Sequence, residues 1–366
     1  MKLSEVVKRI EERLPVGLVT EQDNAGLIAG DYDDECGMMI AAYELNAGVI
    51  EEALKAGANL IVTYHTPLFR PTKSFTSSGA RPDPLFQAVR SGINVFAVHT
   101  SLDIPNYGLN FDLASRLGLS DVKILSPLEN SLYKIVVFVP QDHLEKVRAV
   151  MSKSGAGQIG NYSECAFVAD GEGSFLPGAG ASPFIGSPGK PEKTNESRLE
   201  MIVEKSLTGA VIEAMLKVHP YEEVAYDVYP LANSSSNYGF GAIGEFDDAL
   251  PVNKFLDRVK KVLGLSHITV SHLDGTNIRK VALCAGSGVS FYRDAVRKKA
   301  DIFITGDVKH HDFREAKLQR TILADATHRG TERFAAEVLH RILRQTFENR
   351  IVVNLSKHEY DSAVIF

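Results

Sequence analysis

The chain has 366 residues, of which 44% are hydrophobic and 23% charged, and its formal net charge is −6. This profile is typical of a globular protein with two or three domains and excludes extensive disorder. The acidic balance makes nucleic-acid binding unlikely. Three widely spaced cysteines without a Cys-x-x-Cys motif argue against a disulfide framework or a zinc finger. Because the N-terminus resembles an amphipathic helix and no apolar run would span a bilayer, we expect a cytoplasmic protein without membrane contact.

Apolar strands alternate with amphipathic helices in the first third of the chain. We predict the strands Met38–Ala42, Leu60–Val62 and Val95–Val98, with a helix at Ala47–Lys55 between the first two. Strands that are apolar on both faces indicate a parallel sheet with helices on both sides. This segment therefore predicts an α/β layer architecture.

The pattern changes near Tyr133, and a stretch rich in Gly, Pro and Ser follows and runs to about Asn195. We interpret the change as a domain boundary. The order strand, helix, strand, strand, helix, strand suits a ferredoxin-like domain of about 110 residues. Its predicted elements include Tyr133–Val139, His143–Ser152, Glu200–Val203, Thr208–Leu216 and Tyr221–Tyr229.

After a polar linker at Asn233–Asn237 the alternation of strands and helices resumes. The predicted elements are helix Val252–Leu263, strand Lys280–Cys284, helix Val289–Lys298, strand Asp301–Ile304, helix Phe313–Leu318, strand Thr321–Ala324 and a long final helix from Gly330. We therefore predict a two-lobed α/β domain interrupted by an inserted α+β domain, because insertion at an exposed loop is readily tolerated. The expected bounds are 1–128 for the first lobe, 129–232 for the insert and 233–366 for the second lobe.

His328 and Glu332 are four residues apart on a predicted helix, so both side chains face one side. An imidazole and a carboxylate in this arrangement can bind one metal ion. A surface pair is the simpler alternative. The position directly after the predicted strand Thr321–Ala324 favours a pocket, because ligands bind at the carboxyl ends of strands in open α/β sheets.

His65 and His99 also follow predicted strands, and Asp103 lies four residues after His99. Neighbouring parallel strands are about 4.8 Å apart, so their ends would bring these side chains together. Metal chelation and a neutral His–Asp hydrogen bond are equally compatible with this arrangement. Together with His328 and Glu332, this set of nitrogen and oxygen ligands without thiolates suits Zn, Mn, Fe or Ni.

Two further segments follow or connect predicted strands in the C-terminal third. Thr305–His311 contributes an acid, a cation and two imidazoles after strand Asp301–Ile304, either near the metal or as a solvated helix start. Ala285–Gly288 is too short for a nucleotide-binding fingerprint and predicts a tight turn whose amides could meet an anion.

Several motifs occur in a recognisable order: Glu21–Leu27, Tyr64–Phe69, His99–Asp103, Ile304–Asp307 and His328–Glu332. In this order they resemble the family of GTP cyclohydrolase 1 type 2 homologues, also called the NIF-three-like family. Two middle segments, Gly157–Tyr162 and His219–Tyr226, are similar to the PII/CutA-like insert of its longer members. The resemblance covers almost the whole chain.

The resemblance implies a di-metal centre in a cleft between two α/β lobes, and a toroidal homohexamer whose cavity the sites face. Carried over by position, His65, Asp103 and Glu332 would hold one divalent ion, and His328 with bridging Glu332 would serve a second. The family usually has His-His where this chain has Tyr64-His65. A phenol is a poor ligand unless it ionises, so the second ion is bound weakly, completed by His99 or water, or absent.

The functional hypothesis is a metal-dependent hydrolase in which a metal-activated water attacks a nucleotide-like or other small substrate. Glu332 and His99 are its expected catalytic residues, with Glu332 orienting the metal or shuttling a proton and His99 acting as acid or base. The resemblance suggests GTP as substrate, but no residue pattern identifies a guanine pocket. The alternative is a non-catalytic, metallochaperone-like assembly with a ligand-sensing insert.

Overall fold

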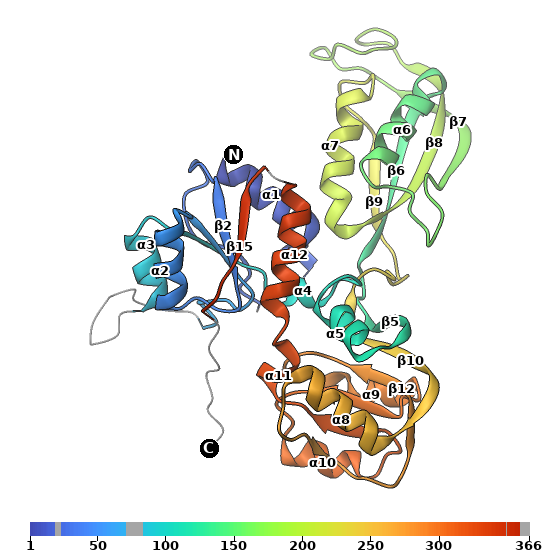
Figure 1. Ribbon diagram of the computed structural model, residues 1–366. Coiled ribbons are helices and arrows are strands. Elements are labelled where there is room, and N and C mark those ends of the chain that lie inside the picture. Colours follow the sequence, from blue (N-terminus) through green and yellow to red (C-terminus); the bar gives the residue numbers. More distant parts are fainter. Residues whose placement is uncertain (19–22, 71–82, 349, 359–366) are drawn as a thin grey trace. The chain divides into compact units, whose positions relative to one another are not determined.

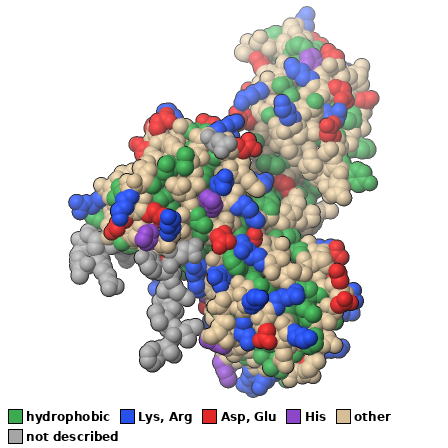
Figure 2. Space-filling view, in the orientation of Figure 1, with side chains coloured by type: hydrophobic (Ala, Val, Ile, Leu, Met, Phe, Trp, Pro, Cys, Tyr) green, Lys and Arg blue, Asp and Glu red, His purple; other side chains and the backbone are tan. Residues whose placement is uncertain are grey.

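The computed structural model describes residues 1–18, 23–70, 83–348 and 350–358 (Figure 1). The chain divides into two compact units. One combines Met1–Pro127 with Asn237–Phe366, and the other is the intervening segment Leu128–Ser236. Among the described residues, no helix combines the length and apolar character needed to cross a membrane. On the face shown in Figure 2, acidic and basic side chains are interspersed, without a large field of one sign.

The first sheet of the larger unit has five strands. Their spatial order is β1 (Gly26–Ala29), β4 (Asn94–Ala97), β3 (Leu60–Thr63), β2 (Met38–Ala42) and β15 (Val352–Leu355). All neighbours are parallel except β1 and β4. Alternate residues of the strands pack into two different cores, because successive side chains point to opposite faces. One core joins them to α2 (Ala47–Ala56) and α3 (Pro84–Arg90), and the other to α1 (Leu3–Arg13) and α12 (Ala335–Phe347).

The second sheet of this unit has six strands. Their order is β11 (Thr269–Val270), β14 (Ile322–Asp325), β13 (Ile302–Thr305), β12 (Asn277–Leu283), β10 (Gly239–Pro251) and β5 (Ser120–Pro127). Only β12, β13 and β14 are parallel neighbours. One face packs on α5 (Leu109–Leu117) and α8 (Val252–Leu263), and the other on α9 (Tyr292–Arg297) and α10 (His310–Ala316). Each sheet has one edge strand from the other part of the sequence. β5 precedes the insert but belongs to the second sheet, whereas β15 follows all strands of the second sheet but belongs to the first.

The smaller unit has one antiparallel sheet with helices on one face. Its elements are β6 (Leu132–Pro140), α6 (Leu144–Lys153), β7 (Ala166–Phe175), β8 (Glu192–Glu204), α7 (Thr208–Val218) and β9 (Tyr226–Pro230), with the strand order β7-β8-β6-β9. Ile135, Val137 and Leu199 point toward the helices and pack against Val147 and Val211. In the described part of this unit, the opposite face of the sheet has no helix over it.

Strand β8 is much longer than the predicted Glu200–Val203. Its first half alternates between exposed and half-buried positions, and β7 is exposed along most of its length. Because β7 and the first half of β8 have no fully buried face, they lack the apolar alternation on which the sequence prediction depended. The Gly-, Pro- and Ser-rich stretch therefore contains strand as well as loop.

The predicted final helix is divided in two. Helix α11 (His328–Glu332) ends before Arg333, and α12 begins at Ala335 after Phe334, whose φ of −97° and ψ of 2° lie outside the helical range. Phe334 is buried with the guanidinium of Arg116 3.8 Å from its ring centroid. Tertiary packing at this ring accompanies the break, which leaves α11 as a short separate helix directly after β14.

Asn110 on α5 links the ends of the two sheets. Its Nδ2 donates to the carbonyl of Asp103 at 3.1 Å, and its Oδ1 accepts from the amide of Ala285 at 2.8 Å. Asn110→Ala removes both bonds at a buried position, so we expect the free energy of unfolding in urea to fall by about 1–3 kcal/mol. The exposed Ser115→Ala on the same helix serves as control and should change it by less than about 0.5 kcal/mol. An equal effect of both substitutions would contradict this role of Asn110.

Candidate metal centre

The histidines of the site lie at the carboxyl ends of parallel strands. His65 follows β3 and extends its ladder, with its amide donating to the carbonyl of Tyr43 at 2.8 Å. His99 follows β4, and its amide donates to the carbonyl of Tyr64 at 2.8 Å. His328 follows β14 as the first residue of α11, where the Thr327 hydroxyl accepts from the amide of Gly330. The strand ends of both sheets thus supply side chains to one place.

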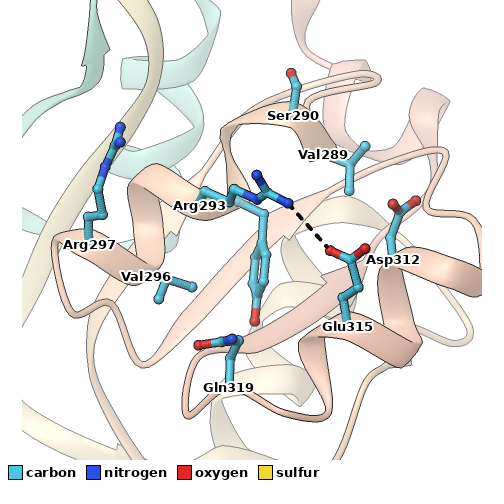
Figure 3. A pocket seen from close by; sticks show the side chains of 9 residues that line it. Val289, Ser290, Arg293, Val296, Arg297, Asp312, Glu315 and Gln319 are labelled. Carbon is cyan, nitrogen blue, oxygen red and sulfur yellow. Dashed lines mark ion pairs between the residues drawn. The ribbon is translucent and has the colours of Figure 1, made fainter.

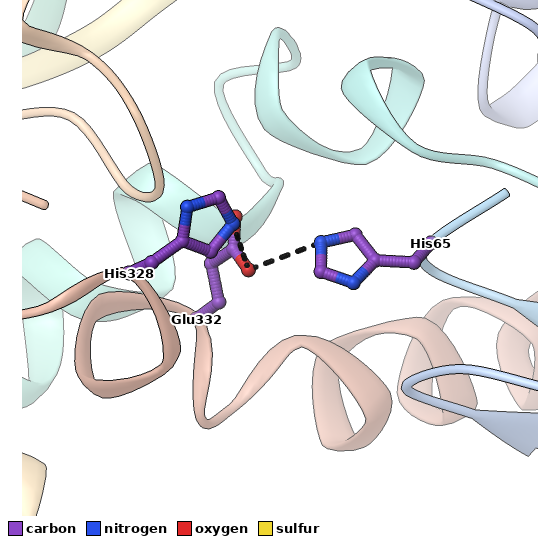
Figure 4. Close-up of side chains that lie close together, drawn as sticks. All are labelled: His65, His328 and Glu332. Atoms are coloured by element: carbon purple, nitrogen blue, oxygen red, sulfur yellow. Dashed lines mark ion pairs between the residues drawn. The ribbon is translucent and has the colours of Figure 1, made fainter. Parts of the chain in front are cut away.

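Glu332 is the point on which His65 and His328 converge (Figure 4). Its Oε2 lies 3.2 Å from Nε2 of His65 and 3.1 Å from Nε2 of His328. In the described part of the chain, these three residues form the group whose potential ligand atoms all lie within 4.8 Å of one another. Two imidazole nitrogens and a carboxylate oxygen are a suitable donor set for Zn, Fe, Mn or Ni. The residues present therefore fit a divalent ion.

The charges of this triad, formed by His65, His328 and Glu332, also favour a bound cation. Burial alone would raise the pKa of Glu332, but hydrogen bonds and charge from His328 and His65 outweigh it and lower the pKa to about 2. The hydrogen bond that His328 donates to Glu332 raises the pKa of His328 to about 9, against the effect of burial and with help from Asp307. A buried carboxylate that stays ionised requires compensating positive charge, which protons on the imidazoles or a metal ion can supply.

Two tyrosines complete the surroundings of the Glu332 carboxylate. Tyr43 donates to its Oε2 at 2.7 Å, and the Tyr64 hydroxyl lies 3.1 Å from its Oε1. The same Tyr64 hydroxyl is 3.0 and 3.1 Å from the two carboxylate oxygens of Asp103. Burial, followed by the charges of Asp103 and Glu332, holds the pKa of Tyr64 well above its usual value. The phenol therefore remains protonated and links the two carboxylates.

The structure does not bring all the predicted ligands together. Asp103 is hydrogen-bonded to Tyr64 and, within the described residues, is not a member of the close group of ligand atoms. Its pKa is raised well above the usual range by burial and by the charge of Glu332. Tyr43 was not singled out from the sequence, although it directly follows strand β2 as Tyr64 and His65 follow β3. The tendency of ligands to bind at the carboxyl ends of strands would have indicated it.

His99 is paired with an acid that the sequence analysis did not single out. Its Nδ1 forms a short hydrogen bond with Oδ1 of Asp23, whose Oδ2 accepts from the amide of Thr100 at 3.3 Å. Burial lowers the pKa of His99, but Asp23 more than offsets this and the pKa is raised. Asp23 belongs to the motif Glu21–Leu27, of which Glu21 and Gln22 lie outside the described residues. Its position in that motif was the only sequence signal.

Three strained backbone conformations lie at the site. Of the eight described residues other than glycine that have positive φ, three belong to it: His99 at 39°, Asp307 at 55° and Thr327 at 60°. Oδ2 of Asp307 lies 2.6 Å from Nδ1 of His328 and so orients the imidazole whose other nitrogen faces Glu332. Such conformations persist only where the surrounding structure enforces them, and they are common at functional sites.

The turn at Ala285–Gly288 packs directly against the carboxylate of the site. Gly286 has a φ of +65°, and a Cβ added to it would collide with Oε1 of Glu332. Its amide donates to the hydroxyl of Thr331 at 2.9 Å, and that of Gly288 donates to Thr305 at the same distance. The predicted tight turn is confirmed, but these two amides are bonded within the protein. The turn makes room for Glu332.

A hollow of about 350 Å³ opens beside the triad and is lined by His65, His99, His328, Phe69 and neighbouring residues. A larger hollow of about 690 Å³ borders α9 and α10 (Figure 3), where Arg293 and Glu315 form an ion pair at 3.9 Å. The described lining of the larger hollow contains no close group of metal-type ligands. The smaller hollow is therefore the place where a substrate would meet the triad.

The family assignment follows from fold, site and sequence together. Residues 1–362 match the model of the Duf34/NIF3 (NGG1p interacting factor 3) family, and the chain belongs to this family. It is 36% identical over 361 residues to a protein of Halalkalibacterium halodurans named GTP cyclohydrolase 1 type 2 homolog, covering 98% of this chain and 95% of the relative. A Bacillus subtilis protein of the same name is 33% identical over 359 residues, covering 98% and 96%.

Solved structures show the same architecture. The crystal structure of a Bacillus cereus protein related to NIF3 superposes with a TM-score of 0.87 at 31% sequence identity. The match covers 100% of this chain and 99% of that chain. A Staphylococcus aureus protein superposes with a TM-score of 0.74 at 25% identity, again over 100% and 99%. The mixed α/β fold with several sheets is thus the fold of the family.

The pair formed by His328 and Glu332 predicts a pH dependence of stability in metal-free protein. Because the pKa of His328 is raised from 6.5 to about 9, its stabilising effect is complete below pH 6.5 and is lost as the pH rises through about 9. The difference in free energy of unfolding between the wild type and His328→Asn should therefore shrink from pH 6.5 to pH 9.5. Urea denaturation at both pH values measures it.

His310→Asn, at an exposed histidine of the same unit, is the matched control and should differ from the wild type equally at both pH values. A difference for His328→Asn that stays constant between the two pH values would contradict the raised pKa.

Proposed function

We propose that the protein is a metal-dependent hydrolase whose divalent ion is held by His65, His328 and Glu332. The observation that carries this proposal is the convergence of two imidazole nitrogens on one buried carboxylate beside a hollow. When bound, such an ion supplies Lewis-acid chemistry and lowers the pKa of a water molecule. The hollow of about 350 Å³ suits a small substrate or the reactive part of a larger one.

The residues around the ion have separate roles in this proposal. Glu332 holds the ion, and the Tyr43 hydroxyl and His328 fix the position of the Glu332 carboxylate. His99 lines the hollow, and its ring centroid lies 5.7 Å from that of His65. Because Asp23 binds its Nδ1, His99 presents Nε2 as the nitrogen that can accept or donate a proton. We assign His99 as acid or base, with Asp23 positioning it.

Tyr64 supports a centre with one strongly bound ion. A second ion held by Asp103 and Glu332 would have to lie between two carboxylates that the Tyr64 hydroxyl already connects. A protonated phenol donates a hydrogen bond there, whereas the histidine that the family resemblance implies would offer a nitrogen lone pair. We therefore propose that Asp103 fixes Tyr64 in this chain and binds a second ion only weakly.

Substrate and assembly are proposals that rest on relatives and topology. The names of the relatives make GTP the first substrate to test, and the resemblance makes a homohexamer the expected assembly. We propose that 129–232 is a ferredoxin-like, PII/CutA-like domain, which the strand order β7-β8-β6-β9 with helices on one face supports. The alternative function, a metal-binding regulatory assembly, is favoured by a separate hollow of about 520 Å³ within that insert.

Metal binding and turnover test the ligand set. We expect about one equivalent of Zn, Mn or Fe per chain in the wild type, and a loss of affinity of about 100-fold or more in His328→Ala and Glu332→Gln, because each removes a ligand. Metal content by mass spectrometry and GTP turnover with each ion added are the measurements. His310→Ala is the matched control and should retain both properties.

Metal binding and turnover that survive both substitutions would contradict the proposal. Stoichiometric metal binding without turnover on a panel of nucleotides would favour the regulatory alternative instead.

Tyr64→His tests the role of the phenol. The substitution supplies an imidazole beside Asp103 and Glu332, so we expect a second equivalent of metal to bind with an affinity at least about tenfold higher than in the wild type. Isothermal titration calorimetry measures both binding steps. Tyr43→His is the control, since Tyr43 contacts Glu332 but forms no bond with Asp103 among the contacts described. Equal second-site binding in the wild type and Tyr64→His would contradict this role.

A further inference from the structure

The inserted unit has a hollow on the sheet face that lies opposite its helices. Residues paired across antiparallel strands point to the same face, as do alternate residues within one strand. Phe138 on β6 is paired with Arg198 on β8, and Glu196 lies two residues before Arg198. These side chains therefore share the face that carries the hollow, whose volume is about 520 Å³. This size suits a small organic molecule.

Aromatic rings form much of the wall of this hollow. Phe138 and Phe175 come from the sheet, Phe184 from the loop between β7 and β8, and Tyr221 from the segment before β9. The ring centroid of Tyr221 lies 6.5 Å from that of Phe175 and 6.2 Å from that of Phe184. Phe184 is 53% exposed, although it faces an apolar hollow. A ligand that covered it would bury apolar surface.

The charged groups of the lining are all acidic. Glu196 accepts a hydrogen bond from the Tyr221 hydroxyl at 2.8 Å, and a Cβ added to Gly173 would collide with its Oε2, so glycine makes room for this carboxylate. Glu222 holds the loop by accepting from the amide of Ser182 at 2.8 Å. Glu223 also lines the hollow, and no Lys, Arg or His is among its described lining residues.

The cationic groups near this face are already engaged, including His143, whose ring centroid lies 5.5 Å from that of Phe184 and whose Nδ1 lies 2.9 Å from Oδ1 of Asp142. Arg198 forms an ion pair with Glu200 at 2.9 Å. The imidazole of His219 contacts the carbonyl of Phe138 through Nε2, and burial lowers its pKa. A phosphate group would therefore meet carboxylates without a matching cation, which argues against nucleotides in this hollow.

We propose that the hollow binds a small organic cation, an ammonium group attached to an apolar or aromatic body. The faces of the aromatic rings carry negative potential that attracts ammonium groups, and the carboxylates of Glu196 and Glu223 add net negative charge. The apolar body would cover the exposed ring of Phe184. This site lies wholly within the inserted unit and is independent of the metal centre.

Calorimetric titration of the full-length protein with matched probes tests the proposal. We use 2-phenylethylammonium as the cation, 2-phenylethanol as its neutral analogue, and phenylacetate and ATP as anions. The cation should bind about tenfold more tightly than the alcohol, because only the cation gains the ring and carboxylate interactions. The two anions should show no saturable binding in the insert.

Substitutions locate the site. Glu196→Gln should weaken binding of the cation about tenfold with little effect on the alcohol, whereas Phe184→Ala, at an exposed position, should weaken both. Glu172→Gln is the matched control, because this exposed residue of β7 lies outside the lining and should leave both affinities unchanged. Circular dichroism confirms that each variant is folded.

Equal affinity for the cation and the alcohol would overturn the proposal, as would cation binding that Glu196→Gln leaves intact. Competition by ATP for the same hollow, or the absence of saturable binding by the cation, would also overturn it.

Discussion

The structure depends most on a single buried charge, the carboxylate of Glu332. An ionised carboxylate in the interior is costly unless hydrogen bonds and opposite charge compensate it. Four side chains supply this compensation, from His65, His328, Tyr43 and Tyr64. They come from the ends of two strands, β2 and β3, and from the first residue of α11, so that the charge fixes where these elements meet. A divalent metal ion would compensate the carboxylate with its two positive charges, in place of protons on the imidazoles.

Several local features follow from the need to bring groups close to this carboxylate. Gly286 avoids a Cβ where Oε1 of Glu332 lies, and Thr327 adopts a strained φ just before His328. Asp307, also at positive φ, fixes the second nitrogen of His328. These strained conformations lie at the site itself. They are expected where the local geometry serves binding and not stability.

Much of the fold and part of the site could be predicted from the sequence. The buried strands Met38–Ala42 and Leu60–Val62 carry continuous apolar runs, and the tendency of ligands to bind at the carboxyl ends of strands indicated His65, His99 and His328 as members of one site. Glu332 followed from helical spacing. The separation of Asp103 from the close triad could not be predicted, because it depends on the Tyr64 hydroxyl that connects the two carboxylates. Asp23 meets His99 across 76 residues of sequence, a contact that no local pattern contains. Strand β7 was missed because both of its faces are largely exposed.

The most direct test of the account is anomalous diffraction from crystals soaked with Zn or Mn and measured at the absorption edge of the metal. We predict one strong peak per chain, bordered by Nε2 of His65, Nε2 of His328 and Oε2 of Glu332, with little or no signal beside Asp103. A strong peak coordinated by Asp103 and the Tyr64 hydroxyl, or no peak at the triad, would contradict it.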